Sequence, residues 1–410
     1  MYTSRNRLTT PAGASIVAAG KEDLTRRFEV GLLGCGDVSD IYFQNCKSFQ
    51  ILEITACASL HLEKAQRKAS KHGIAKACGT EELIADPQLN IILNLTVPEA
   101  HAALTLAALR AGKHVYSEKP LAAGIEEGRQ ILATARSRNL YVGCAPDTFL
   151  GGRLQTCRRV MDEGLIGEPL GAGAFMLCHG HEWHHPNPAF FYQRGGGPLL
   201  DMGPYYLTAL VSLLGPAARC CAFTKMTFSE RTIESGTRRG ETLRVEVPTH
   251  ICGNVEFANG TLATIVTSFD VWDSQLPRLE IYGTKGTLCI PDLDPLEGPN
   301  LFGGPVWVKT GRTSRWCGLP RARGLEKWDE APVRHSYTQN SRGLGLADMA
   351  YAIRDGRPAR AGAEMAFHSL EIMHGLLRSA ELGRYYELQS TCLRPAPLPV
   401  DFPASEDQMG

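Results

Sequence analysis

The sequence predicts two successive domains: an α/β Rossmann domain with a doubly wound parallel sheet, followed by an α+β domain with a large, mainly antiparallel open sheet. Three observations support this. A chain of 410 residues exceeds what one hydrophobic core usually supports. Short apolar β-rich runs alternate with helical runs between Phe28 and Val142, which is typical of a parallel sheet covered on both faces. Longer strand-like runs joined by turn sequences follow Pro146.

The first half contains five apolar runs that predict strands. They cover residues 28–33, 51–58, 91–95, 113–116 and 140–143. Between them lie the predicted helices, at 38–49, in an Ala-, Lys- and Glu-rich stretch that ends at 72, at 99–111 and at 124–138. We therefore expect a dinucleotide-binding fold over 27–145. Residues 1–26 lack the long apolar core of a secretory signal, and we expect a flexible tail there.

The second half changes in style. Strands are predicted at 170–177, 249–257, 262–269, 278–281 and 287–290. Asn259-Gly260 is a hairpin signal, and residues 283–286 form another tight turn. Helices are predicted at 152–163, 344–354 and 364–382, and an extended loop at 291–334. We expect an α+β substrate-binding and oligomerisation domain over 146–394 and, because four prolines follow, a flexible tail over 395–410.

Composition excludes several classes of protein. Lys plus Arg and Asp plus Glu both number 43, so there is no overall positive charge to hold a nucleic acid. No apolar run reaches the roughly 20 residues of a membrane span. The 13 cysteines are spread thinly, several of them within apolar strand-like runs, which favours reduced thiols in the cytoplasm. We expect a soluble cytoplasmic protein without a nucleic-acid or membrane partner.

A glycine-rich turn follows the first predicted strand. Gly34 permits a tight turn, and Gly36 allows the backbone to approach a pyrophosphate. Asp37 and Val38 then lead into the helix, where Ser39 is small enough for close packing on the strand. A strand, this turn and a helix in succession predict a dinucleotide site. The alternative is an ordinary glycine-rich turn between a strand and a helix.

The end of the second predicted strand bears on the choice of cofactor. An acid there would bind the adenosine ribose and select NAD, but the residue is Ser59. Ser59 does not repel a 2′-phosphate, and His61 and Lys64 lie near enough to attract one. The sequence therefore favours NADP over NAD. The alternative is that Ser59 only caps the next helix.

Three further stretches carry a family resemblance. They are residues 94–101 (NLTVPEAH), 112–120 (GKHVYSEKP) and 195–205 (GGGPLLDMGPY). With the glycine turn, their order resembles the Gfo/Idh/MocA oxidoreductases, from about residue 28 to about 382. The resemblance implies NAD(P)-dependent oxidation or reduction of sugars, cyclitols and related alcohols. It also implies a second-domain sheet that forms homodimers or homotetramers.

The resemblance assigns roles to individual residues. Lys119, in Glu-Lys-Pro, would contact both cofactor and substrate, and Asp201 matches the aspartate of Asp-x-Gly. Four residues later many members carry histidine, whereas this chain has Tyr205 and resembles the branches that use tyrosine as acid/base. A second acid common in the family is replaced by Thr208. The same stretches supply further predicted cofactor contacts, namely Leu95, Thr96, Pro98, His101 and Glu118.

The chemistry of such a site can be argued from the residues. Hydride leaves carbon only as a proton leaves oxygen, so a base must reach the substrate hydroxyl. A phenol with a pKa of ~10 is a poor base unless a cation such as Lys119 or the oxidised nicotinamide favours the phenolate. Asp201 would orient the group, one helical turn from Tyr205. Pro204 is tolerated in the first turn of a helix, so we expect the helix to begin near Asp201.

Each of these residues has a simpler interpretation. Asp201 could be a helix N-cap, Tyr205 a half-buried aromatic beside Tyr206, and Lys119 a solvated lysine. Two rival functions also remain open at this stage. One is C=C or imine reduction of the biliverdin-reductase type, which needs little from a base. The other is a sensor that binds dinucleotide without turnover.

Residues 178–194 are rich in histidine and aromatic side chains and are expected to overhang the substrate. Trp183 and His185 are the predicted contacts to a small polyhydroxylated substrate, through stacking and hydrogen bonds. The histidines also suggest metal ligands, but their spacing matches no zinc pattern and we expect no metal. The alternative is a purely structural loop. Asp147, Trp272 and Arg278 are further candidates for the pocket wall.

Overall fold

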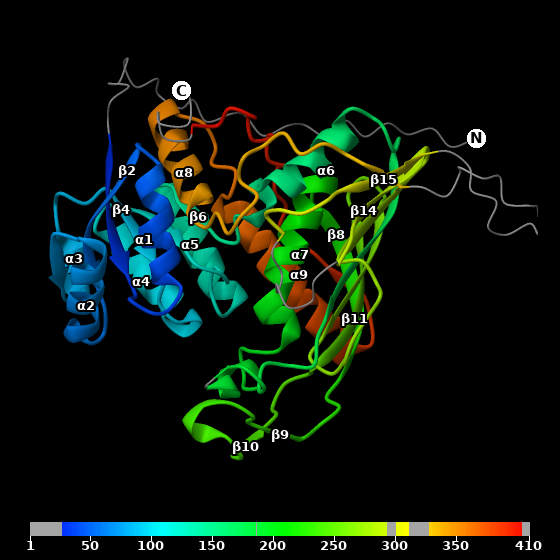
Figure 1. The fold of residues 1–410 in the computed structure, drawn as a ribbon, viewed down its shortest axis with the longest axis horizontal. Coiled ribbons are helices and arrows are strands. Elements are labelled where there is room, and N and C mark those ends of the chain that lie inside the picture. Colours follow the sequence, from blue (N-terminus) through cyan, green and yellow to red (C-terminus); the bar gives the residue numbers. More distant parts are fainter. Residues whose placement is uncertain (1–26, 186, 293–300, 311–327, 404–410) are drawn as a thin grey trace, which may run out of the picture.

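Six parallel strands form the first sheet of the computed structural model, which describes residues 27–185, 187–292, 301–310 and 328–403 (Figure 1). They are β1 (Phe28–Leu33), β2 (Leu52–Ala58), β3 (Lys76–Cys78), β4 (Ile91–Asn94), β5 (His114–Ser117) and β6 (Val142–Cys144). The sheet order is β3-β2-β1-β4-β5-β6, so it reverses between β1 and β4. Ligands of such sheets bind at this reversal, outside the carboxyl ends of the strands.

Five helices cover the first sheet. They are α1 (Ser39–Asn45), α2 (Leu62–His72), α3 (Thr80–Ala85), α4 (Pro98–Arg110) and α5 (Ile125–Ser137). Strands β4 and β6 are buried on both sides, as the lack of polar alternation in their sequences predicts. Helix α2 ends at Gly73, which adopts a left-handed conformation with φ of 73°.

Nine strands of the described residues form a second, mixed sheet. They are β7 (Pro169–Leu177), β8 (Ala217–Lys225), β11 (His250–Phe257), β12 (Leu262–Ser268), β13 (Leu279–Gly283), β14 (Gly286–Ile290), β15 (Trp307–Thr310), β16 (Asp329–Glu330) and β17 (Tyr386–Glu387). Their order is β16-β15-β14-β13-β7-β12-β11-β8-β17, and only β7 and β12 pair in parallel. A separate two-stranded ribbon joins β9 (Glu230–Thr232) and β10 (Thr242–Arg244). The predicted fold class is confirmed.

The second half contributes four described helices, of which three lie beside the second sheet and one, at residues 344–355, lies beside the first sheet (Figure 1). They are α6 (Gly152–Asp162), α7 (Pro198–Leu214), α8 (Leu344–Asp355) and α9 (Ala363–Leu382). Short 3₁₀ turns occupy Cys46–Ser48, Thr148–Leu150, Pro188–Phe191 and Gly236–Arg238. Figure 1 shows α6, α7 and α9 on one face of the second sheet, and no helix of the described residues covers the opposite face.

The C-terminal part of the chain contacts both domains. Gly362 forms an antiparallel bridge with Gly143 in β6, and Cys144 N–H donates to the Ala361 carbonyl at 3.0 Å. Helix α9 packs on α5 as well as on β8. The last helices therefore hold the edge of the first sheet as well as covering the second.

Several expectations differ from the structure. The helix α3 and the strands β3, β8, β9, β10 and β17 were not predicted. The expected loop at 291–334 contains β15 and β16, while residues 293–300 and 311–327 lie outside the described residues. In the expected C-terminal tail, Leu398 N–H donates to Gln155 Oε1 at 2.8 Å and Phe402 is buried. Residues 395–403 are thus packed on the protein. The predicted tail residues 1–26 and 404–410 also lie outside the described residues.

Helix α7 begins within one turn of Asp201, as expected, but the expectation that Pro204 lies in its first turn is wrong. The helix begins at Pro198, because Gly197, with φ of 92°, turns the chain and Pro198 suits the first helical position. Pro204 is consequently the seventh helical residue and cannot donate a backbone hydrogen bond. Helix α7 tolerates it because nearly all of its side chains are buried and packing holds the helix.

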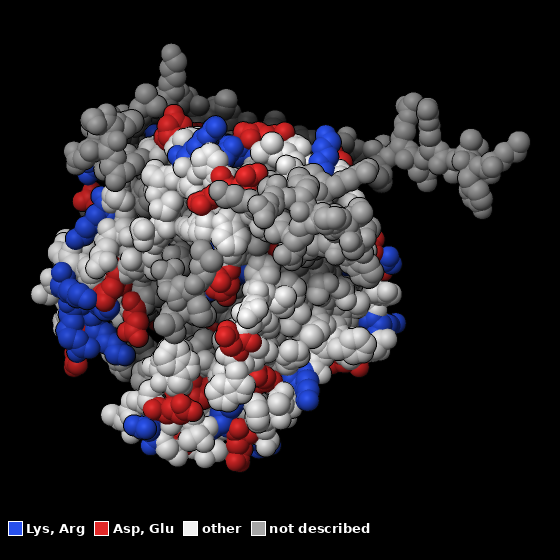
Figure 2. Space-filling model, turned by 45° about the vertical axis from the view of Figure 1, so that its right-hand side comes forward, with Lys and Arg blue, Asp and Glu red and all other residues white. Residues whose placement is uncertain are grey.

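Three further features of the described residues concern membrane spans, cysteines and metal ligands. No helix within the described ranges is long and apolar enough to cross a membrane. The described cysteines are free thiols. The described side chains include no group of three or more His, Cys, Asp or Glu arranged to hold a metal ion. Figure 2 shows basic and acidic side chains mixed over most of one face, with one basic group at its left edge.

Candidate active site

The glycine turn after β1 has the geometry of a dinucleotide cradle. Gly34 has φ of 103°, and a Cβ there would lie 2.6 Å from the Leu95 backbone. A Cβ on Gly36 would meet nothing within 4 Å, so that stretch of backbone faces open space. The Ser39 hydroxyl donates to the Gly36 carbonyl at 2.6 Å and is fully buried. The turn is therefore closed on the protein side and open on the side where a pyrophosphate would approach.

The end of β4 lies beside this turn. Leu95 N–H donates to the Leu33 carbonyl at 2.7 Å, and the Thr96 hydroxyl donates to Asn94 Oδ1 at 2.7 Å. Pro98 starts α4. These residues stand at the carboxyl edge of the sheet, where the predicted cofactor contacts were placed. Asp37 and Val38 follow the glycine turn at the start of α1.

The end of β2 is also open. Ser59 is partly exposed, and α2 begins at Leu62 with His61 as its cap residue. The simpler interpretation, that Ser59 caps this helix, does not fit, because Ser59 lies two residues before the cap.

His101 was predicted to contact the cofactor, but both nitrogens of its ring contact backbone carbonyls of the protein. Nδ1 lies 2.7 Å from the Pro120 carbonyl and Nε2 lies 2.9 Å from the Thr96 carbonyl. The side chain is 1% exposed. His101 therefore ties two loops of the site together and presents no free ring nitrogen to a ligand.

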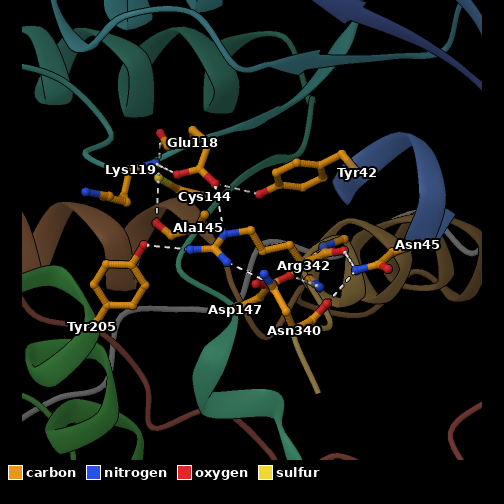
Figure 3. Close-up of polar contacts among 12 residues, drawn as sticks. Tyr42, Asn45, Glu118, Lys119, Cys144, Ala145, Asp147, Tyr205, Asn340 and Arg342 are labelled. Carbon is orange, nitrogen blue, oxygen red and sulfur yellow. Dashed lines mark hydrogen bonds and ion pairs between the residues drawn. The ribbon is translucent and has the colours of Figure 1, made fainter. Parts of the chain in front are cut away.

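Glu118 is likewise turned into the protein. It accepts a hydrogen bond from the Tyr42 hydroxyl at 2.9 Å, and from the backbone N–H of Lys119 at 3.0 Å (Figure 3). Its Oε1 lies 3.8 Å from Arg342 Nε. The carboxylate thus supports the neighbouring residues of the site.

Lys119 and Asp201 join the two domains at the end of β5 and the first turn of α7. Lys119 Nζ donates to Asp201 Oδ1 and to the Asp201 carbonyl, both at 2.7 Å. Burial lowers the pKa of Lys119, but Asp201 and Tyr205 raise it further, so the net shift is upward and the ammonium stays charged. Its side chain is only 17% exposed, which does not fit the solvated-lysine interpretation. Asp201 is not the helix cap either, since Gly197 occupies that position.

Tyr205 faces two cations. Lys119 Nζ lies 5.4 Å from the centre of its ring, and Arg342 Nη2 donates to its hydroxyl oxygen at 3.1 Å (Figure 3). The phenol therefore lies within reach of two positive charges. Arg342 was not predicted, because it lies 137 residues after Tyr205 and no motif marks it.

The loop that carries Arg342 is held by buried contacts. Asp147 Oδ2 accepts backbone hydrogen bonds from Gly343 at 3.0 Å and from Gly345 at 2.9 Å. Burial raises the pKa of Asp147 to about 6. The Asn45 amide donates to the Arg342 carbonyl at 2.9 Å. Asp147 was a candidate for the pocket wall. In the structure it holds the backbone at the start of α8 instead.

A cavity of about 950 Å³ is lined in part by Met202, the residue that follows Asp201 in α7. Trp183, Trp272 and Arg278 line it. His185 does not line it: its ring packs on Phe190 and Phe191 instead.

His181, which was not predicted, also lines this cavity. Its Nε2 lies 3.8 Å from Asp201 Oδ2. Burial lowers the pKa of His181 to about 4, so the imidazole is neutral at physiological pH. The loop around it is held by Glu182, which accepts from the Arg231 guanidinium at 2.7 Å and from the Tyr192 hydroxyl.

Comparison with known proteins bears directly on this arrangement. The family model for the NAD-binding Rossmann fold of the Gfo/Idh/MocA oxidoreductases matches residues 28–145, and the model for the Gfo/Idh/MocA C-terminal domain matches 154–289. The 1,5-anhydro-D-fructose reductase of Ensifer adhaerens is 28% identical over 243 residues, or 58% of this chain and 67% of that protein. The trans-1,2-dihydrobenzene-1,2-diol dehydrogenase of Bos taurus is 29% identical over 248 residues, or 60% of this chain and 68% of that protein.

Solved structures share the fold. Levoglucosan dehydrogenase in complex with NADH and levoglucosan superposes with a TM-score of 0.72 at 20% identity, covering 88% of this chain and 99% of that one. An NAD-binding oxidoreductase from Klebsiella pneumoniae gives 0.73 at 20% identity, with coverage of 88% and 98%. Both domains and their succession are matched in these comparisons. The chain therefore belongs to the Gfo/Idh/MocA family of oxidoreductases, whose first domain is an NAD-binding Rossmann fold.

Proposed function

We propose that this protein catalyses reversible hydride transfer between NAD(P) and a secondary alcohol carbon of a sugar, cyclitol or similar polyhydroxylated substrate. The observation that carries the proposal is the meeting of Lys119, Asp201 and Tyr205 at the carboxyl edge of the first sheet. Two relatives support it, since they are named for reactions of an anhydrosugar and of a dihydrodiol.

The first domain fits the cofactor. Gly36 leaves open space where a pyrophosphate would lie, and Gly34 lets the end of β4 approach closely. Leu95, Thr96 and Pro98 stand at the same edge and would flank the nicotinamide half. When bound, the nicotinamide supplies or accepts the hydride.

The protein's own residues handle the proton. The positively charged Lys119 ammonium stabilises the alkoxide that forms on the substrate oxygen. Asp201 holds this ammonium in position by a hydrogen bond. Tyr205 Oη exchanges the proton with the substrate hydroxyl. Arg342 donates to that same oxygen and stabilises the phenolate that forms.

The rival functions explain less of this geometry. Reduction of a C=C or imine bond needs no base, yet the phenol here is placed between two cations. A sensor that never turns over needs no lysine held by a carboxylate beside the cofactor edge. We therefore favour the alcohol–ketone reaction.

Stopped-flow mixing tests this function. The protein, preloaded with NADH or NADPH, is mixed with a panel of keto-sugars and keto-cyclitols, and reduced-cofactor absorbance is followed. We expect a single-turnover decay with at least one carbonyl compound. Oxidation confined to enones or imines in a parallel panel would support the reductase instead, and no oxidation in either panel would support the sensor.

We also propose a preference for NADP over NAD. Ser59 leaves the end of β2 uncharged, and Lys64 follows within the first turn of α2. Introducing a carboxylate with Ser59→Asp should weaken NADPH binding about tenfold or more, because it would repel the 2′-phosphate, and should spare NADH. Lys64→Ala should also weaken NADPH selectively. Lys68→Ala is the matched control, since Lys68 lies on the same helix but is bound to Asp40 at 2.7 Å. Fluorescence titration of both cofactors measures this, and an equal loss for both would contradict it.

The second sheet is the proposed contact between copies of this chain, as a homodimer or homotetramer. Its helix-free face carries an apolar row of cross-strand partners, Phe223, Cys252 and Val266. Phe223 is 86% exposed, and Leu262 on the same face of β12 is 61% exposed. A second copy would cover this row.

The free thiols support a reducing compartment such as the cytoplasm.

Charge on this face should disrupt the assembly. We expect Phe223→Glu to convert the oligomer to monomer in analytical ultracentrifugation, because the interface would have to bury an unpaired carboxylate. Leu165→Glu is the control, since Leu165 is exposed but lies outside the sheet. An unchanged sedimentation coefficient for Phe223→Glu would place the interface elsewhere.

A further inference from the structure

The cavity beside the reaction centre is larger than a single sugar ring requires. Its volume of about 950 Å³ is at the top of the roughly 300–1,000 Å³ typical of ligand pockets. Its described lining comes from the second domain: the end of β7 and the loop after it, the β9 region, Met202 and the segment after β12. None of the residues assigned to the cofactor lines it, so the cofactor does not account for this space.

Trp272 forms an aromatic platform at this cavity. Its indole stacks on the His179 ring with 3.4 Å between centroids and 13° between planes. Phe228 meets the same imidazole edge-on at 6.4 Å. Trp272 is nevertheless 82% exposed, so a well-supported aromatic side chain remains accessible to a ligand. Flat aromatic faces of this kind stack on the C–H face of a sugar ring.

The cavity meets the reaction centre at His181. This residue lines the cavity, and its Nε2 lies 3.8 Å from Asp201, the carboxylate that holds Lys119. Within the described residues Nε2 is buried and has no hydrogen-bond partner. A hydroxyl of a bound ring would satisfy it. A substrate whose first ring reacts at Lys119 would therefore extend past His181 toward Trp272.

The charges around the cavity limit what the extension carries. Its two lining arginines, Arg231 and Arg278, are each held by a carboxylate, at 2.7 and 2.8 Å respectively. Glu230, Glu234 and Asp273 also line it and form no ion pair in the part of the chain that the structure describes. An anionic extension would meet these carboxylates and find both arginines already engaged. A neutral or positively charged extension meets no such penalty.

We propose that this cavity is a subsite for the second ring of a neutral or positively charged glycoside, stacked on Trp272. The inference rests on the proposed function and narrows its substrate from a single sugar to a two-ring glycoside. His181 bonds a hydroxyl near the junction of the two rings.

Calorimetric titration tests the subsite without requiring turnover. The protein is saturated with reduced cofactor, which forms a non-reacting complex with alcohol substrates. The probes are the methyl glycosides of glucose, galactose and mannose, the methyl glycosides of neutral disaccharides of the same sugars, and a sulfated form of the disaccharide glycoside that binds best. We expect at least one disaccharide glycoside to bind about tenfold tighter than its monosaccharide counterpart, and the sulfated form to bind more weakly than its neutral parent.

Variants locate the effect. Trp272→Ala should remove about three- to tenfold of the disaccharide affinity and leave the methyl glycoside unchanged. Tyr385→Ala is the control, because Tyr385 is an exposed aromatic on Arg219, outside the cavity. Equal affinity for methyl glycosides and disaccharides, tighter binding of the sulfated form, or an equal loss for both probes in Trp272→Ala would overturn the subsite. Because binding is measured with a non-reacting complex, these outcomes are independent of whether hydride transfer occurs.

Discussion

Lys119→Met should lower kcat/KM on an identified substrate by about 10²–10³ and weaken cofactor binding by a much smaller factor. The substitution keeps the length of the side chain but removes the charge that would stabilise the alkoxide. It also removes both 2.7 Å contacts to Asp201, so that carboxylate loses its fixed partner. Single-turnover absorbance measures the chemical step, and fluorescence titration measures the cofactor.

A matched variant separates catalysis from general loss of charge. Lys76→Met also removes an ion-paired lysine of the first domain, but this one is paired with Glu82 and Asp86, outside the proposed site. It should leave the rate unchanged. Unchanged turnover in Lys119→Met would remove the lysine from the chemistry, and with it the proposed function. An equal rate loss in Lys76→Met would attribute the effect to structure.

Tyr205→Phe should cost about 10²–10⁴ in the rate of the chemical step, with little change in substrate affinity. The ring would still pack beneath Lys119, because only the hydroxyl is removed. That hydroxyl is the atom to which Arg342 donates at 3.1 Å, and it is the proposed proton carrier. Stopped-flow rates as a function of pH, compared with the wild type, measure the effect.

The neighbouring tyrosine provides the control. Tyr206 is buried on the same helix, and its hydroxyl accepts from Arg278 at 3.5 Å, away from Lys119. Tyr206→Phe should leave the rate within a few-fold of wild type. A loss below tenfold in Tyr205→Phe would point to Lys119 or water as the proton carrier. A pH dependence that instead centres near 4, and disappears in His181→Gln, would identify His181 as the group that titrates.

Much of the fold could be predicted because its signals are local. Strand β4 is buried on both faces, so it stands out as an unbroken apolar run, and the turn residues Asn259-Gly260 mark the hairpin between β11 and β12. Strand β8 was missed because Ala217–Lys225 contains mainly small side chains, and its apolar and polar residues do not alternate clearly. Its place between β11 and β17 is set by packing on α9, which no local pattern reports.

The residues of the candidate site also fall into those that a sequence motif marks and those that none marks. Lys119, Asp201 and Tyr205 lie in short motifs, so a resemblance could assign them. The sequence could not indicate Arg342, because its contact with Tyr205 depends on the tertiary structure. The backbone next to Arg342 is held by Asp147, which is distant in the sequence. Trp183 and His185 lie two residues apart in an irregular loop, where no periodicity indicates which side chain faces the ligand. The structure directs only Trp183 to the cavity.

The bridge between Gly143 and Gly362 has a consequence for dissecting the protein. Strand β6 is the last strand of the first sheet, and residues 361–362 cover the side of it that β5 leaves unpaired. A fragment cut after residue 145 would present bare backbone N–H and C=O groups along that strand, which is a template for pairing with another molecule. The dinucleotide-binding half thus depends on a distant part of the same chain for protection against self-association.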